Sequence, residues 1–337
     1  MEAGHDVRLA VGRDEGHVPP PCALDVVPAL ASRAHAEARG LDAIASAFAP
    51  DVVHVHTVMN PAVLEWAAAR CAVITVQDHR CFCPTRGKWT AAGSVCAEPM
   101  RPEVCAACFD DEAYFREVYA LTAVRLSAIR KMSLVVLSHY MKKELVDAGV
   151  AEDRVTVVPP FVHGLDSEAR PDGPSCVLFV GRLTATKGAM EAVEAWRHSG
   201  LDLPLVVAGA GPLRAAMEDS GAHVLGWLNH RRLSAVYKSA RVLVMPSRWQ
   251  EPFGIAGLEA LTLGTPVAAW RSGGVAEWHT GEGLVPWGDF AALAAALRNA
   301  RAAGPARPFG FDRESLMDRL AGVYEKTGTF CAVKSNS

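Results

Sequence analysis

The strongest constraint on the fold is a regular alternation of short apolar runs with longer segments rich in Ala, Leu and Glu. Strands nearly apolar on both faces are typical of parallel sheets covered by helices on both sides. We therefore predict an α/β fold with parallel sheets. The expected strands are 6–11, 51–56, 72–77, 133–138, 155–159, 176–181, 204–208, 222–226, 241–246 and 265–270. The expected helices are 24–48, 61–70, 112–131, 140–148, 189–199, 212–219, 230–239, 255–263, 289–302 and 312–326.

A polar stretch with Gly and Pro, residues 163–174, divides the chain into two α/β halves. The 337 residues leave room for two domains of ordinary size. We expect a first domain at 1–165, a second at 166–310, and a terminal helix at 311–327 that packs back across their junction.

Composition removes several classes of function. Half of the residues are hydrophobic and the net charge is −3, which gives no reason to expect a nucleic-acid partner. No apolar run reaches the 18 or more residues of a membrane span. The printed start has neither a basic region nor an apolar core, so it is not a secretory signal, and we expect a cytoplasmic location.

Five of the nine cysteines crowd into residues 81–108. Cys105 and Cys108 have the Cys-x2-Cys spacing of a zinc knuckle, and Cys83 and Cys96 supply two further thiols. A structural zinc on these four residues is one hypothesis, with Cys81 as a competing ligand. Reduced free thiols are an equal alternative, and disulfides or an iron–sulfur cluster are the remaining ones.

Residues 251–259, Glu-Pro-Phe-Gly-Ile-Ala-Gly-Leu-Glu, carry the clearest chemical signal. Two carboxylates, Glu251 and Glu259, flank a glycine-containing turn that opens an apolar helix. The free N–H groups of a helix start bind anions such as a diphosphate. Carboxylates only accept hydrogen bonds, which suits the hydroxyls of a sugar and of a ribose. This pattern predicts a nucleotide-sugar site.

Two cations follow the first strand of the second half, where open α/β sheets bind their ligands. Arg182 offers a planar fork of donors and Lys187 a compact charge, and together they suit a diphosphate. Solvated loop cations are the alternative. The later Gly209-Ala210-Gly211-Pro212 lacks the third glycine of a dinucleotide fingerprint, which argues against a nicotinamide cofactor.

The order of these motifs along 176–302 resembles the donor domain of the retaining glycosyltransferases of family 4, of the Glu-x7-Glu type. The resemblance implies the GT-B architecture, two facing Rossmann-like domains with the reaction between them. It also implies transfer of a hexosyl unit from a nucleoside-diphosphate sugar with retention, and no cofactor or metal for the chemical step.

The resemblance assigns roles to individual residues. Arg182 and Lys187 would bind the diphosphate and, with Glu251 on the sugar hydroxyls, form the catalytic set. Glu259 would hold the ribose. The remaining donor-binding positions are the amides of Phe253, Gly254 and Ile255, together with Gly181 and, beside the base, Trp227.

The first half resembles the family's acceptor domain less closely. Gln77, Asp78 and His79 fall on the acceptor side, where many relatives carry a His-Asp pair, and Gln77 stands at the position of that His. Because Gln does not titrate, acid/base chemistry at this position is in doubt. Residues 4–7 resemble the family's second strand, which implies that the first strand of the family is not in the given sequence. Either the true start lies upstream or the acceptor domain is incomplete.

The acceptor stays open at this stage: a glycan, a lipid-linked or a small-molecule acceptor. Two other functions remain, a nucleotide-sugar-binding protein without turnover and a nucleotide-sugar epimerase. A basic patch of Arg125, Arg130-Lys131 and the segment 140–145 predicts weak peripheral membrane contact, with an ordinary helix surface as the alternative. The segment 87–89, Gly-Lys-Trp, is either a contact for an anionic acceptor or a solvated loop.

Overall fold

A computed structural model describes residues 4–14, 22–85, 87–163, 165, 175–300 and 311–335. In this structure the second half of the chain forms a six-stranded parallel sheet. The strand order is β12-β11-β10-β7-β8-β9, and every neighbouring pair is parallel. The strands are β7 (Cys176–Val180), β8 (Leu205–Ala208), β9 (His223–Gly226), β10 (Ala240–Met245), β11 (Val267–Trp270) and β12 (Leu284–Val285).

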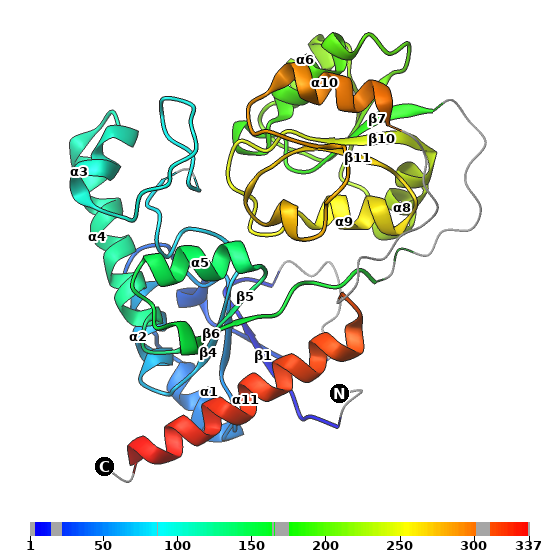
Figure 1. Ribbon diagram of the computed structural model, residues 1–337. Helices are drawn as coiled ribbons and strands as arrows, with labels where there is room; N and C mark the ends of the chain where they lie inside the picture. The colour runs from blue at the N-terminus through cyan, green and yellow to red at the C-terminus, as the bar shows by residue number, and fades with distance from the viewer. Residues whose placement is uncertain are drawn as a thin grey trace.

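Helices cover both faces of this sheet (Figure 1). α6 (Ala189–Ser199) and α10 (Phe290–Asn299) lie on one face, while α8 (His230–Ser239) and α9 (Ile255–Thr262) lie on the other. The short α7 (Arg214–Asp219) precedes β9. Strands enclosed in this way carry apolar side chains on both faces, and five of the six residues of β10 are buried.

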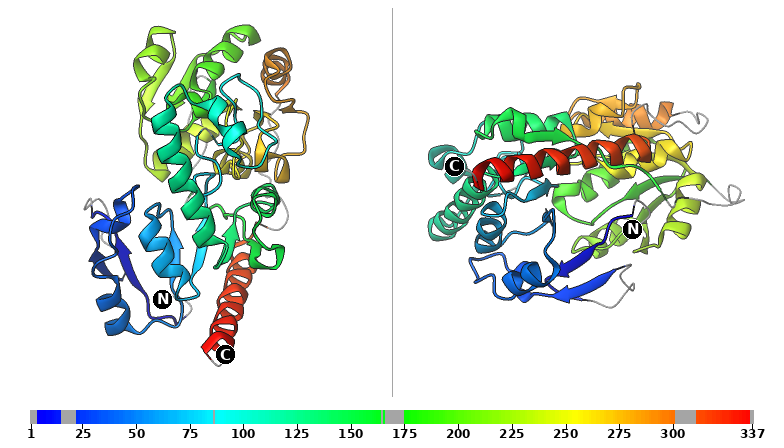
Figure 2. Two further views of the ribbon diagram at one scale, coloured as in Figure 1. Left: turned by 90° about the vertical axis from the view of Figure 1, so that its left-hand side faces the viewer. Right: turned by 90° about the horizontal axis from the view of Figure 1, so that it is seen from below.

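The first half holds a four-stranded parallel sheet in the order β3-β4-β5-β6 and a separate parallel pair, β1-β2. Figure 2 shows the pair beside the larger sheet. The strands are β1 (Arg8–Val11), β2 (Ala23–Val26), β3 (His54–His56), β4 (Val73–Val76), β5 (Ser133–Val136) and β6 (Val155–Val157). The helices are α1 (Leu41–Phe48), α2 (Pro61–Ala68), α3 (Pro102–Cys105), α4 (Glu112–Ile129) and α5 (His139–Asp147). The expected α/β fold with parallel sheets is confirmed.

The terminal helix α11 (Arg313–Ser335) follows the second half but packs against the sheet of the first, as Figures 1 and 2 show. The Tyr324 hydroxyl lies 2.8 Å from Nδ1 of His54, whose Nε2 lies 2.7 Å from the Thr75 hydroxyl. The Thr327 hydroxyl donates to that of Ser133 at 2.8 Å. His54 therefore anchors this helix.

The prediction of a helix over residues 24–48 is wrong for the first two thirds of this range. Residues 23–26 instead pair with β1, and the Val27 N–H continues that pairing by donating to the Val11 carbonyl at 2.7 Å. Pro28 then opens a single 3-10 turn, and helix α1 begins only at Leu41. The pairing with β1 overrode the helical propensity of an Ala-rich segment. The strand β12 and the helix α3 were not expected.

The linker expected at 163–174 falls mostly on residues 164 and 166–174, which lie outside the described residues. Among the described helices, none has both the length and the apolar character needed to cross a membrane.

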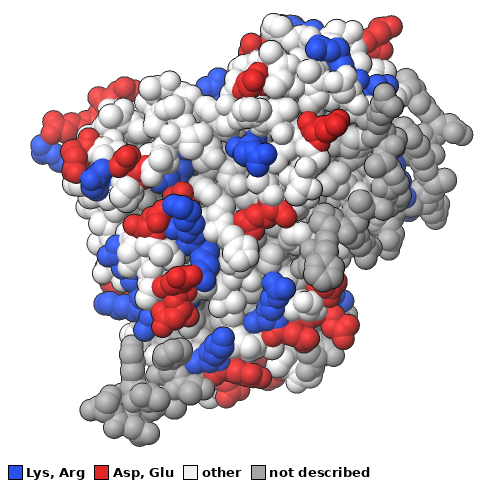
Figure 3. Space-filling model, in the orientation of Figure 1, with Lys and Arg blue, Asp and Glu red and all other residues white. Residues whose placement is uncertain are grey.

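Charges of both signs are interspersed on the face shown in Figure 3, with no extended field of one sign. Of the residues of the expected basic patch, Arg130 and Lys131 are exposed. Arg125 is buried, with its guanidinium donating to the carbonyls of Met59 and Arg33. Lys142 pairs with Glu152 at 3.2 Å and Lys143 with Asp147 at 2.5 Å.

Candidate active site

Three loops at the carboxyl ends of β7, β8 and β10 pack backbone against backbone. A Cβ on Gly188 would lie 1.8 Å from the Pro246 carbonyl oxygen, and one on Gly209 would lie 1.8 Å from the Gly181 carbonyl oxygen. Gly188 also has a φ of +70°, which L side chains rarely adopt. Gly188 therefore lets the segments that carry Lys187 and Glu251 approach each other, and Gly209 does the same for the loops after β7 and β8.

Lys187 and Glu251, 64 residues apart, meet in an ion pair at this edge. The Lys187 ammonium lies 2.8 Å and 3.0 Å from the two carboxylate oxygens, and the Ser247 hydroxyl donates to one of them at 2.6 Å. The ammonium also lies 4.5 Å from the ring centre of Trp249. The structure therefore joins directly two groups that the sequence assigned to different parts of one ligand.

Burial and ion pairing shift the pKa of Glu251 in opposite directions. The side chain of Glu251 is 4% exposed. Burial alone would raise the pKa of this carboxyl, but the Lys187 charge and the hydrogen bonds from Lys187 and Ser247 outweigh it and lower the pKa. Glu251 is therefore an anion at neutral pH, able to accept hydrogen bonds from hydroxyl groups.

Glu251 is fixed through its backbone as well. Its N–H donates to the Ser272 hydroxyl at 3.1 Å, and its carbonyl accepts from the Gly274 N–H at 2.8 Å. A Cβ on Gly273 would lie 2.3 Å from the same carbonyl oxygen, so only glycine permits this contact. The loop after β11 thus holds the carboxylate in place.

The second predicted carboxylate, Glu259, lies on α9 and accepts a hydrogen bond from the hydroxyl of the fully buried Tyr237 at 2.8 Å. Burial raises the pKa of Glu259, and the Tyr237 hydrogen bond acts in the opposite direction. Tyr237, to which the sequence assigned no specific role, orients this acid.

The start of α9 has the predicted form. Gly254 caps it with a φ of +85°, Phe253 before it is buried, and Ile255 is 41% exposed. Gly257 lets the helix approach its neighbours, because a Cβ there would lie 2.0 Å from the Trp278 ring. The first turn of α9 is therefore held rigidly beside Glu251.

Arg182 and Trp227 follow β7 and β9, at the same edge of the sheet. Arg182 is exposed, and Trp227 is 80% exposed, which is unusual for so large an aromatic side chain. Neither lies within the Lys187–Glu251 cluster. Both side chains are exposed, so an extended ligand could bind to them.

On the first half, the three predicted residues have three different environments. Gln77 is exposed, and Asp78 is bound by its neighbour Arg80, whose Nε lies 2.8 Å from the carboxylate. Burial would raise the pKa of Asp78, but the Arg80 hydrogen bonds and charge lower it. His79 is buried, its Nε2 lies 3.0 Å from the Tyr140 hydroxyl, and burial lowers its pKa to about 4.

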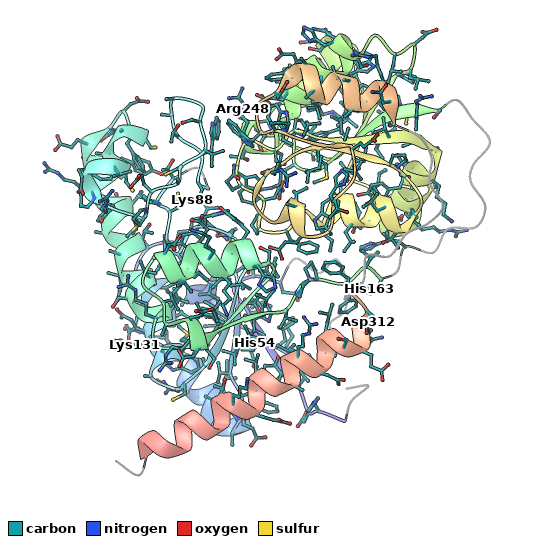
Figure 4. All side chains as sticks on the ribbon, viewed as in Figure 1. His54, Lys88, Lys131, His163, Arg248 and Asp312 are labelled. Atoms are coloured by element: carbon teal, nitrogen blue, oxygen red, sulfur yellow. The ribbon has the colours of Figure 1, made fainter. Side chains whose placement is uncertain are left out.

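The two halves meet over this site. The Gln250 N–H donates to the Gly87 carbonyl at 3.0 Å, and the Ser138 hydroxyl donates to the Pro252 carbonyl at 2.5 Å. Figure 4 labels Lys88 and Arg248 on the two sides of this contact, where the Arg248 guanidinium lies 5.2 Å from the Trp89 ring centre. Segments 87–89 and 248–250 therefore form an interdomain contact directly before Glu251.

The segment 87–89 is not the solvated loop that the sequence also allowed. Lys88 is 5% exposed, pairs with Glu144 of α5 at 3.0 Å, and donates to the Glu98 carbonyl at 2.6 Å. This buried pair anchors the cysteine-rich segment to α5. Sequence reasoning missed it because nothing local identifies Glu144 as the partner.

The four cysteines of the zinc hypothesis carry free thiols. Burial raises the pKa of Cys105 to about 11, and the thiols of Cys83, Cys96 and Cys108 are near enough to add to this shift. Among the described residues, no three His, Cys, Asp or Glu side chains are placed so that they could hold a metal ion. The zinc site stays a prediction.

Family models match both halves of the chain. The model for glycosyltransferase family 4 matches residues 1–163, and the model for glycosyl transferases group 1 matches residues 165–300. Glycogen synthase of Mycobacterium tuberculosis is 29% identical over 313 residues, which are 82% of this chain and 68% of that protein. Several other relatives are matched over only 45% to 48% of their own length.

Solved structures support the same architecture. Sucrose-phosphate synthase from Thermosynechococcus elongatus superposes with a TM-score of 0.66 at 19% identity, covering 100% of this chain and 91% of that one. Anabaena HepE in complex with UDP-glucose gives a TM-score of 0.57 at 15% identity, covering 86% and 76%. Two adjoining family matches and a shared GT-B fold lead to one conclusion: the chain belongs to family 4 of the glycosyltransferases.

Proposed function

We propose that the protein transfers a hexosyl unit from a nucleoside-diphosphate sugar to an acceptor, with retention of the anomeric configuration. The observation that best supports this proposal is the ion pair between Lys187 and Glu251 beside the start of α9. The Lys187 ammonium lies 2.8 Å from a carboxylate oxygen of Glu251. A cation and unpaired amides suit a diphosphate, and the adjoining carboxylate suits sugar hydroxyls.

In this proposal the Lys187 ammonium turns from Glu251 toward the incoming diphosphate. Arg182, Gly181 and the amides of residues 253–255 complete the anion site. The acceptor oxygen bonds to the anomeric carbon of the sugar as the bond from that carbon to the diphosphate breaks, and the departing diphosphate takes the acceptor's proton. The cations and amides at this site stabilise the negative charge that accumulates on the diphosphate. Glu251, fixed by Ser247 and Ser272, accepts from hydroxyls of the sugar.

Two residues would hold the nucleoside. Glu259, oriented by Tyr237, accepts from a ribose hydroxyl. The exposed indole of Trp227 provides a flat surface for the base. The UDP-glucose bound to HepE supports a uridine donor as the first candidate to test.

On the opposite side, Gln77, Asp78 and His79 face the acceptor in this reading. The acceptor is a glycan, a lipid-linked or a small-molecule hydroxyl compound. The cytoplasmic location and the weak peripheral membrane contact expected from the sequence stay predictions, and the paired lysines of α5 reduce the free charge for such a contact.

Labelled UDP-, ADP- and GDP-glucose separate the proposal from its alternatives. Transfer that requires an added acceptor, with an α-linked product by NMR, supports a retaining transferase. Binding without release of the diphosphate indicates a nucleotide-sugar-binding protein. Isomerised nucleotide-sugar without transfer indicates an epimerase.

Two variants test the residue roles. We expect Lys187→Ala and Glu251→Ala each to lower turnover at least tenfold, because each removes a charged contact to the donor. Activity within a factor of two of the parent in either variant contradicts the assignment. Arg197→Ala, in the last turn of α6 and away from this edge, is the matched control.

A further inference from the structure

The indole ring of Trp249 lies between the Lys187 ammonium and the first half of the chain. The ammonium lies over the ring, 4.5 Å from its centre. The imidazole of His79 meets the ring edge to face, with the two ring centres 5.9 Å apart. Gly87 packs so closely that a Cβ there would lie 3.0 Å from a carbon of the indole ring. Trp249 thus contacts both the Lys187 charge and the first half.

The main chain around Trp249 is held by hydrogen bonds. Its N–H donates to the carbonyl of Thr186, the residue before Lys187, at 3.1 Å, and its carbonyl accepts from the Ser272 hydroxyl at 2.6 Å. The next N–H, that of Gln250, donates to the Gly87 carbonyl at 3.0 Å. These bonds keep the indole ring close to the segment that carries Lys187.

The ring attracts the ammonium without using its N–H groups. A cation over an aromatic face is held by the negative charge of the π system, so the three N–H groups of a lysine remain able to donate. Glu251 and a diphosphate compete for those N–H groups, but the ring competes with neither. Lys187 can therefore keep its contact with Trp249 when a diphosphate replaces the carboxylate.

The contact should become stronger when an anionic ligand covers the ammonium. The Lys187 side chain is 22% exposed, so water screens part of its charge. A cation–π contact contributes more to binding once water is excluded from it. Because a bound diphosphate displaces this water, part of its affinity should come from the ring.

We propose that Trp249 is a positioning residue for the donor diphosphate: its ring holds the Lys187 ammonium at the anion site, and the first half holds the ring. This inference rests on the proposed function. It gives the first half a direct effect on diphosphate binding through one side chain of the second half.

The indole N–H of Trp249 provides a second contact, which the test has to separate from the first. This N–H is buried and makes no hydrogen bond of standard geometry within the described residues. Burial raises and Lys187 lowers the pKa of Glu251, and the indole N–H adds to the lowering, so it lies close to that carboxylate. Trp249→Phe removes the N–H and keeps an aromatic face, whereas Trp249→Leu removes both.

Titration calorimetry with UDP, ADP and GDP measures the Kd of each diphosphate. We expect Trp249→Leu to raise the Kd about 3- to 10-fold, the effect of one lost cation–π contact, and Trp249→Phe to stay within about twofold. In Lys187→Met, which has no ammonium, Trp249→Leu should cause no further change. In Arg182→Ala, which keeps the ammonium, Trp249→Leu should have its full effect.

Gly87→Ala tests the part played by the first half. The new methyl group would press on the Trp249 ring, so we expect it to raise the Kd at least about twofold in the parent and to have no effect in Trp249→Leu. Gly93→Ala is the matched control, because Gly93 has a similar φ, +81° against +73°, and a Cβ there has nothing within 4 Å. Equal Kd values for the two alanine variants would show that the first half does not act through the ring.

Other results overturn the proposal. If Trp249→Phe raises the Kd as much as Trp249→Leu, the indole N–H matters and the ring does not. If Trp249→Leu has the same effect in the parent and in Lys187→Met, the residue acts only through packing. If the parent binds none of the three diphosphates, the proposed function fails first and this inference with it. The comparison of the Phe and Leu variants needs no change at Lys187, so it decides the question even if Lys187→Met does not fold.

Discussion

The carboxylate of Glu277, in the second half, accepts a hydrogen bond from the backbone N–H of Tyr140, in the first half, at 2.9 Å. Its other oxygen accepts from the N–H of His139 at the same distance. Both donors belong to the first turn of α5, whose N–H groups have no partner within the helix. Glu277 thus caps a helix of the opposite half of the chain, which ties the two halves together.

Glu277→Ala should weaken this contact by about 0.5–2 kcal/mol, the usual value of a helix cap. We expect the free protein to open, with a larger radius of gyration by small-angle X-ray scattering and a lower kcat/KM for the donor. Glu282→Ala, which changes an exposed carboxylate nearby, is the control. Equal scattering from both variants would show that the cap does not hold the domains together.

Lys187→Met should lower the free energy of unfolding by about 3–5 kcal/mol, because it leaves Glu251 buried without its counter-charge. Urea unfolding of Lys187→Met, Glu251→Gln and the double variant measures this effect. We expect the double variant to lose clearly less than the sum of the single losses. Additive losses would mean that the pair has no coupling.

The free energy of unfolding that Lys187→Met loses relative to the parent should depend on pH in one direction. In the parent, the folded-state pKa of Glu251 lies below its ordinary value of 4.5. The stabilisation is therefore complete above that value and is lost as the pH falls through the folded pKa. In Lys187→Met burial acts without the ammonium, the pKa rises, and the carboxyl destabilises the fold at neutral pH. The difference in unfolding free energy between the parent and Lys187→Met should therefore shrink as the pH is lowered from 7 to 5. A difference that stays constant contradicts this account.

Trp227→Ala should weaken nucleoside-diphosphate binding about 3- to 10-fold while leaving the unfolding temperature unchanged. An aromatic stack contributes about 0.5–1.5 kcal/mol, and an 80% exposed side chain contributes little to the core. Leu225→Ala, at 36% exposure on the neighbouring strand, is the control for general surface change. Calorimetric titration with UDP and thermal unfolding give the two quantities, and unchanged UDP affinity would remove Trp227 from the site.

Gly257→Ala should destabilise the protein by about 1–3 kcal/mol, although alanine favours helices, because the new methyl group would overlap the Trp278 ring. Gly322→Ala in α11 is the matched control, since a Cβ there has nothing within 4 Å. We expect this control to be stabilised by up to about 1 kcal/mol. Equal shifts in urea midpoint for the two variants would refute the packing argument.

The sequence alone predicted most of the strands, and it placed charged groups at the carboxyl ends of strands in the second half. Apolar runs such as 241–246 can be predicted as buried parallel strands from the sequence, because strands in a sheet that is covered on both faces are apolar on both faces. The two carboxylates around the α9 start were also visible, because a glycine turn and a helix start follow each other locally. By contrast, residues 23–26 have a helix-like composition and became a strand only by pairing with β1.

Tertiary structure alone decided which of these groups touch. No local pattern tells that Lys187 pairs with Glu251, that Lys88 pairs with Glu144, or that Glu277 caps α5 across the domain junction. Each partner is contributed by a different loop or helix, and only the packing of the two halves brings them together. The sequence determined which chemical groups reach the sheet edge, because strand ends and helix starts are local features. The fold determined which of them are paired, buried and fixed, because burial and counter-charge depend on neighbours far away in the chain.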